Sequence, residues 1–116
     1  MNTVEIKGKD HVVKYGLSST KRVLALLGAK NISQISKTAD LEMSKWIDFV
    51  MPGLETGAKL SDEPAPSRDD VEQALDLDIN VYYDCLAFFM DDNTPKHERF
   101  KAEDKAVASN SNDEGN

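Results

Sequence analysis

Three side chains of this 116-residue chain have the chemistry of a nucleophile, a general base or a transition-metal ligand: His11, Cys85 and His97. The histidines lie far apart in sequence, and neither has a partner at the spacing of a metal site. A nucleophilic cysteine needs a histidine base and an electropositive setting. Cys85 instead stands beside Leu86 in a stretch rich in aromatic residues, which indicates a small buried thiol. We therefore expect no metal, no cofactor and no enzymatic activity.

The carboxylates are numerous, but they gather where helices are expected to begin or end. The pairs are Asp69/Asp70, Asp76/Asp78 and Asp91/Asp92. A carboxylate in the first turn of a helix complements the positive end of the helix dipole. Helix capping and helix breaking therefore explain these pairs better than an acid/base pair does. The segment from Asp76 to Asp84 also lacks the glycine and the terminal glutamate of a calcium loop.

The charge of the chain limits its partners. Fourteen basic and 21 acidic residues give a formal net charge of −7, which phosphate backbones repel, so we expect no nucleic-acid partner. Residues 1–37 hold seven Lys/Arg and two Asp/Glu, net +5, whereas residues 38–116 hold seven and 19, net −12. No apolar run approaches the roughly 20 residues of a membrane span, and no signal peptide is visible. The single cysteine fits a cytoplasmic setting.

The elements that must position these side chains begin with a β-hairpin over residues 3–15. Val4 and Ile6 alternate with polar residues, as in a half-buried strand. Lys7–Asp10 supplies the turn, in which Gly8 is free to take a positive φ. The alternation continues on the return strand at Val13 and Tyr15, with His11 on the same face.

Apolar residues at three- and four-residue spacing then predict a series of amphipathic helices. The first starts at a Ser18 or Ser19 cap and ends at Gly28, and a short apolar turn follows at Asn31–Ile35. The second starts at Asp40, and Pro52-Gly53 ends or kinks it before a connector over residues 55–67. Its apolar face is Met43, Trp46, Ile47, Val50 and Leu54.

Two more helices complete the predicted core. Ser67 caps the third, with Val71, Ala74 and Leu75 as its apolar face. The fourth carries the clearest stripe and stops at residues 91–95. That stripe is Ile79, Tyr82, Tyr83, Leu86, Phe89 and Met90. The chain is thus predicted to be mainly α, with an α+β label as the alternative. It is a small single domain over residues 1–95, with about four to five helices and an N-terminal hairpin, and residues 96–116 form a charged, flexible tail, disordered at its end.

The aromatic residues supply candidates for protein binding. Trp46 is the only tryptophan, and both core packing and an interface anchor remain open for it. Phe49 and Phe88 lie off the main stripes of their helices, so we expect partial exposure and a protein-binding face. Lys21 and Arg22, a basic pair on the first helix, complete the candidate set.

The order of these elements resembles the tail assembly chaperones of long-tailed bacteriophages. The likeness spans residues 2 to about 95 and ends in a charged tail. Its motifs are the hairpin Val4–Gly8, the Tyr-Gly of Lys14–Leu17, the Leu-rich turn Val50–Leu54 and the acidic helix start Pro66–Val71.

The resemblance implies a non-catalytic function. Such chaperones are similar in binding the long helical tape measure protein, keeping it soluble and delivering tail tube subunits to it. It further implies self-association, a host bacterial cytoplasmic location, absence from the mature virion and a frameshifted longer form. The alternative is another small phage adaptor, such as a head–tail completion protein or an inhibitor of a host factor.

The charge asymmetry leads to a prediction about assembly. If the basic first third of one copy contacts the acidic remainder of the next, the contacts close into rings or extend as helices. We predict that the oligomer size in light scattering falls between about 50 mM and about 500 mM salt, because surface charges are screened over that range. An oligomer size that salt does not change would count against the electrostatic contact.

Overall fold

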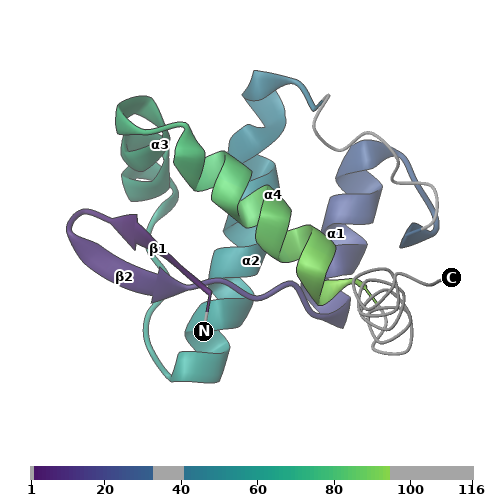
Figure 1. Ribbon diagram of the computed structural model, residues 1–116, viewed down its shortest axis with the longest axis horizontal. Helices are drawn as coiled ribbons and strands as arrows, with labels where there is room; N and C mark the ends of the chain where they lie inside the picture. The colour runs from purple at the N-terminus through teal and green to yellow at the C-terminus, as the bar shows by residue number, and fades with distance from the viewer. Residues whose placement is uncertain (1, 33–40, 95–116) are drawn as a thin grey trace, which may run out of the picture.

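The computed structural model describes residues 2–32 and 41–94 of the chain. Within these ranges the protein is mainly α-helical, with an N-terminal two-stranded antiparallel hairpin, as the sequence predicts (Figure 1). The elements are β1 (Thr3–Ile6), β2 (Lys9–Val12), α1 (Leu17–Leu27), a 3₁₀ turn (Met43–Lys45), α2 (Trp46–Ser61), α3 (Arg68–Leu77) and α4 (Asn80–Asp92).

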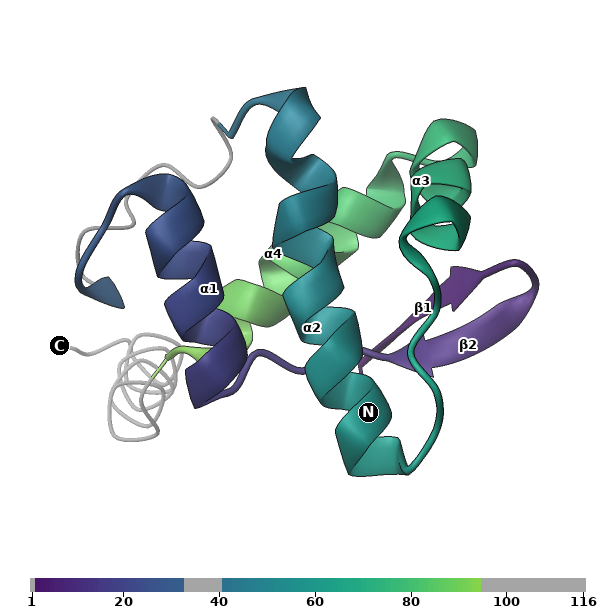
Figure 2. The same ribbon diagram turned by 180° about the vertical axis from the view of Figure 1, so that it is seen from behind.

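Helix α2 is the centre of the arrangement. It contacts α1, α3, α4 and β2, so each of these elements packs on part of its length. Helix α4 crosses one side of α2, with α1 at one end of the molecule and α3 with the hairpin at the other (Figures 1 and 2). The core consequently lies around α2, and α1 and α3 are far from one another.

The hairpin has a tighter turn than the sequence analysis expects. Ile6 pairs with Lys9, so only Lys7 and Gly8 lie between the strands, with φ of 53° and 77°. Two positive φ values are typical of the two-residue turn that matches the twist of a hairpin. The predicted turn over Lys7–Asp10 is therefore wrong by two residues, because Lys9 and Asp10 belong to β2. Val4 pairs with His11 across the ladder, and β2 ends at Val12, so the return strand is shorter than the predicted one, which reaches Tyr15.

Helix α1 begins earlier than predicted. Its N-cap is Gly16 rather than Ser18 or Ser19. The Ser19 hydroxyl instead accepts the backbone N–H of Gly16 at 2.8 Å, reaching back from the third helical position. A side chain at this position stabilises the helix start as a cap does. The predicted end at Gly28 is confirmed, with a left-handed φ of 70°.

Helix α2 continues through Pro52-Gly53 to Ser61, so the prediction that it ends there is wrong. The predicted connector over residues 55–67 is reduced to residues 62–67. The two glycines of α2 do not break the helix but allow other segments to approach it closely. A Cβ at Gly53 would lie 2.6 Å from the Tyr15 ring, and a Cβ at Gly57 would lie 1.9 Å from the Val12 carbonyl oxygen. The Lys14 N–H also donates to the Gly53 carbonyl at 3.0 Å. This packing outweighs the hydrogen bond that Pro52 removes.

Helix α4 buries a different stripe from the predicted one. Its buried residues are Val81, Tyr82, Cys85 and Phe89. Three members of the predicted stripe are instead 44–49% exposed: Ile79, Tyr83 and Met90. The helix is apolar on most sides, so two overlapping sets of apolar residues both have helical spacing. The contact with α2 determines which set is buried. Upstream, the predicted Ser67 cap is confirmed, since its hydroxyl accepts the Asp70 N–H at 3.1 Å.

The core centres on a cluster of aromatic rings. Tyr15 lies 5.4 Å from Phe49 and 5.2 Å from Phe89, and Phe49 lies 5.6 Å from Tyr82, measured between ring centroids. Ring pairs at these separations stabilise a core beyond their buried area. Phe49 is fully buried, so its expected partial exposure is wrong. It lies off the predicted stripe of α2 because that helix is buried on more than one side.

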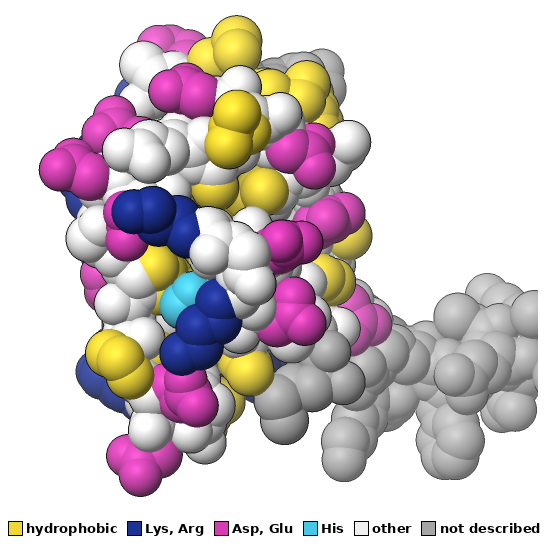
Figure 3. Space-filling model, turned by 90° about the vertical axis from the view of Figure 1, so that its left-hand side faces the viewer, with side chains coloured by type: hydrophobic (Ala, Val, Ile, Leu, Met, Phe, Trp, Pro, Cys, Tyr) yellow, Lys and Arg dark blue, Asp and Glu magenta, His cyan; other side chains and the backbone are white. Residues whose placement is uncertain are grey.

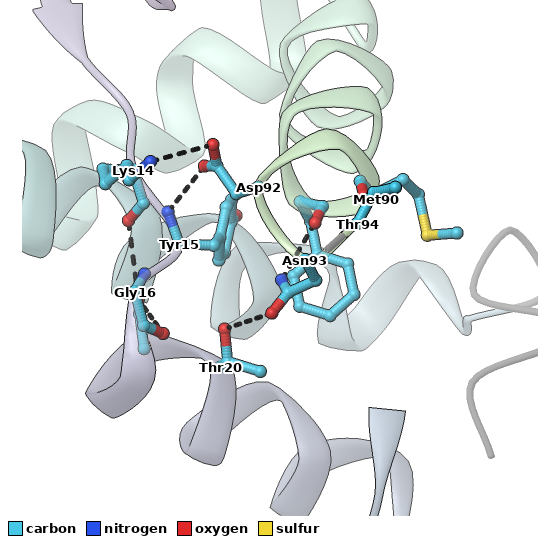
Figure 4. A network of polar contacts seen from close by, with 10 residues as sticks. Lys14, Tyr15, Gly16, Thr20, Met90, Asp92, Asn93 and Thr94 are labelled. Atoms are coloured by element: carbon cyan, nitrogen blue, oxygen red, sulfur yellow. Dashed lines mark hydrogen bonds and ion pairs between the residues drawn. The ribbon is translucent and has the colours of Figure 1, made fainter. Parts of the chain in front are cut away.

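A polar network joins the end of α4 to the start of α1 (Figure 4). The Asp92 carboxylate accepts the Tyr15 N–H at 2.9 Å and contacts the Lys14 ammonium at 3.2 Å. The Thr20 hydroxyl donates to the Asn93 side-chain oxygen at 3.2 Å. Since the Asp92 side chain is only 6% exposed, its paired contacts fix the angle between the two helices.

Some predictions concern residues outside the described ranges. The short turn at Asn31–Ile35 lies partly outside them. The Asp40 cap, His97 and the tail over residues 96–116 lie wholly outside them.

The close approach at Gly57 yields a stability test. We expect Gly57→Ala to lower the free energy of unfolding by about 1–3 kcal/mol, because the new methyl group overlaps the Val12 carbonyl. Gly16→Ala is the steric control, since its Cβ would lie 3.9 Å from the nearest side-chain atom, and any loss of stability there reflects the preference of an N-cap for glycine over alanine. Urea denaturation of both variants measures the difference. A Gly57→Ala protein about 1 kcal/mol more stable than the parent would contradict this contact, because that is the gain expected from alanine in a helix when nothing opposes its methyl group.

Candidate functional site

The side chains with reactive chemistry do not form a site in the described part of the chain. Cys85 is fully buried beneath the aromatic cluster, and burial, with a smaller effect from Asp84, raises the pKa of its thiol to about 12. His11 lies on β2, where desolvation and then Lys9 lower the pKa of its imidazole. No group of three His, Cys, Asp or Glu side chains among the described residues is placed to hold a metal ion.

A surface groove offers a different kind of site. It encloses about 450 Å³ where the start of α2, one side of α3 and the start of α4 meet. Its apolar lining comes from the three elements and consists of Met43, Trp46, Ile47, Leu75 and Ile79. An open hollow of this kind suits a side chain or a helix face better than a small enclosed ligand.

The apolar surface extends beyond the groove. Met43 is 69% exposed, Leu77 is 89% exposed, and Ile79 and Tyr83 are about half exposed. In Figure 3, which shows the end of the molecule formed by α3 and the hairpin, hydrophobic side chains gather among Asp and Glu side chains on the upper part. Grouped exposed apolar residues with a polar rim are typical of protein-binding surfaces.

Trp46 belongs to both the core and the groove. Its ring stacks on Tyr82 at 4.2 Å with an interplanar angle of 1°, and Tyr83 lies against it edge-on at 5.7 Å. The indole N–H donates to the Leu41 carbonyl at 2.9 Å, so this buried polar group is satisfied. The side chain is only 8% exposed. Trp46 therefore forms the rigid floor of the groove instead of projecting from it.

One wall of the groove is acidic. Asp69, Glu72 and Asp76 all line it and follow one another at three- and four-residue spacing, so they lie on one face of α3. In the part of the chain that the structure describes, none of the three forms an ion pair. Their neighbours Asp70 and Arg68 are instead occupied by Lys7 at 3.1 Å and by Asp48 at 2.8 Å.

The five predicted protein-binding residues are not brought together. Of these, only Trp46 lines the groove, Phe49 is in the core, and Phe88 is half-buried on α4. Lys21 and Arg22 lie on α1, at the other end of the molecule, where Arg22 pairs with Glu55. Met43 was predicted as part of a buried helix face rather than as a binding residue, and the acidic wall was not predicted. The repeat of acidic residues along α3 was visible, but helix capping explained part of it.

Basic residues of the first third of the chain form ion pairs with acidic residues of the remainder within the same molecule. Among the residues that the structure describes, four ion pairs join a cation of the basic first third to a carboxylate of the acidic remainder: Lys7–Asp70, Lys9–Glu63, Lys14–Asp92 and Arg22–Glu55. These pairs connect the hairpin and α1 to α2, the segment after it, α3 and α4. Exposed pairs each contribute up to about 1 kcal/mol, so their main effect is to satisfy the cations locally.

Comparisons with protein-family models, with curated proteins and with solved structures find no match to this chain. In the described ranges, no helix combines the length and the apolar character needed to cross a membrane.

The burial of Cys85 predicts an unreactive thiol. We expect labelling by a thiol reagent at pH 8 to be roughly 100-fold or more slower in the folded protein than in urea, because a buried neutral thiol reacts only after opening. The time course of reagent absorbance measures both rates. Fast labelling of the folded protein, at the rate seen in urea, would show an accessible thiol and reopen the enzyme hypothesis.

Proposed function

We propose that this protein is a non-catalytic tail assembly chaperone of a long-tailed bacteriophage, which binds the helical tape measure protein and keeps it soluble. The observation that carries the proposal is the groove between α2, α3 and α4, with its apolar floor and exposed apolar rim. The sequence resemblance over residues 2 to about 95 supplies the identity of the client.

The groove suits a helical client for a physical reason. A long helix with an apolar stripe exposes that stripe until it packs, and exposed stripes promote aggregation. A groove that accepts one face of a helix covers the stripe while leaving the polar face in water. Met43 and Ile79, which line the groove and are exposed, supply apolar contacts on the chaperone side. Several bound copies would cover successive parts of one long client.

Other parts of the role follow from the resemblance and belong to the proposal. They are recruitment of tail tube subunits, self-association, action in the cytoplasm of the host bacterium and absence from the mature virion. The buried state of Cys85 supports a role without chemistry, since the one thiol of the chain is removed from the surface.

Co-expression tests the proposed client. We expect this chain to raise the soluble fraction of a candidate tape measure protein, measured by centrifugation and gel densitometry. Met43→Glu should reduce the effect several-fold, because a carboxylate would replace an apolar contact at the groove. Leu60→Glu is the matched control, since Leu60 is equally exposed but lies on the last turn of α2, outside the groove.

Two outcomes would overturn the proposal. The first is a tape measure protein that is equally insoluble with and without this chain. The second is equal loss of the effect in Met43→Glu and Leu60→Glu, because the groove would then have no special part in it. Circular dichroism of both variants confirms that they remain folded.

A further inference from the structure

We infer that the groove binds an amphipathic helix whose apolar stripe is flanked by Lys or Arg on the side that faces α3. This inference rests on the proposed function for the presence of a client, and it adds the chemistry by which the client is recognised.

The floor selects an apolar helix face. Trp46 is held flat by stacking on Tyr82 and by its hydrogen bond to the Leu41 carbonyl, so it offers a rigid surface. Met43 and Ile79 border this surface, and both expose about half or more of their side-chain area. A flexible methionine beside a fixed aromatic ring adapts to side chains of different shapes. The floor therefore favours an apolar stripe without demanding one sequence.

The wall selects positive charge. Asp69, Glu72 and Asp76 run along about 10 Å of α3, since seven residues separate the first from the last and each adds about 1.5 Å. A partner helix that lies along α3 places residues at the same spacing opposite them. Lys or Arg at those positions would meet three carboxylates that have no ion-pair partner among the described residues. Such complementarity fixes orientation and rejects acidic segments.

A second copy of this chain is a poorer occupant. Each copy has a net charge of −7, so a second copy could meet the acidic wall favourably only through its basic first third. Lys7, Lys9 and Arg22 in the basic first third are already paired within the molecule. The charge that the wall requires is therefore better supplied by a different, basic helix.

A pair of synthetic peptides tests the inference on the full-length protein. Both are helical, about 16 residues long, and share one leucine stripe at helical spacing. One carries lysines on a single flank of the stripe, and the other carries glutamates at the same positions. Trp46 is the only tryptophan and lines the groove, so its fluorescence reports binding when the peptides contain none.

We expect the lysine peptide to bind about tenfold or more tightly than the glutamate peptide at low salt, since each exposed ion pair changes affinity by up to about fivefold. The double variant Glu72→Lys/Asp76→Lys should reverse this preference. Glu5→Lys/Asp84→Lys, which makes the same change in net charge at two exposed positions outside the groove, is the matched control and should leave the preference unchanged. Circular dichroism verifies that the variants are folded.

Several results would overturn the inference. Equal binding of the two peptides, or an unchanged preference in Glu72→Lys/Asp76→Lys, would show that the wall does not select charge. Self-association in light scattering that Met43→Glu abolishes and Leu60→Glu does not would make a second copy the occupant. If the chaperone role is wrong but the inference about the groove is right, the lysine peptide binds as expected, whereas co-expression leaves the tape measure protein insoluble.

Discussion

The structure depends on the contact between helix α2 and the segment that leaves the hairpin. At Gly53 and Gly57 the helix has no side chain, so the backbone at Val12 and the ring of Tyr15 lie directly on it. A two-stranded hairpin is not stable alone in water, and this contact gives it a surface to rest on. It also carries Tyr15 into the aromatic cluster, where the ring touches Phe49 and Phe89, and thereby sets the position of α4. The chain then turns at once into α1, so one close approach orders most of the fold.

Local patterns predicted the elements but misjudged residues whose role depends on a distant partner. The hairpin, the helix end at Gly28 and the Ser67 cap are short-range features, and each was foreseen from its own few residues. Pro52-Gly53 has the composition of a helix end, but the sequence does not reveal that Tyr15 will occupy the space beside Gly53. In the same way, two stripes on α4 have helical spacing, and only the position of α2 decides which one is buried.

The groove was hard to foresee for a related reason. Its floor is built from residues that look like core, and its wall from residues that look like helix caps and a solvated face. Trp46 was a candidate for either role, and the structure gives it both, with one face on Tyr82 and an edge at the surface. Met43 belonged to a predicted core stripe, yet it precedes α2 in a 3₁₀ turn that points it outward. The acidic wall becomes a distinct feature only in the structure, where the ion pairs of the described residues do not include Asp69, Glu72 or Asp76.

The two ends of helix α4 take part in different contacts. Ile79, just before it, lines the groove, whereas Asn93, just after it, is bonded to Thr20 on α1. The thirteen residues between them hold these points about 20 Å apart. Asn93 and Thr94 therefore lie at the end of α4 remote from the groove. The rigid helix separates the contact with α1 from the groove, so a substitution at one end of α4 leaves the residues at the other end in place.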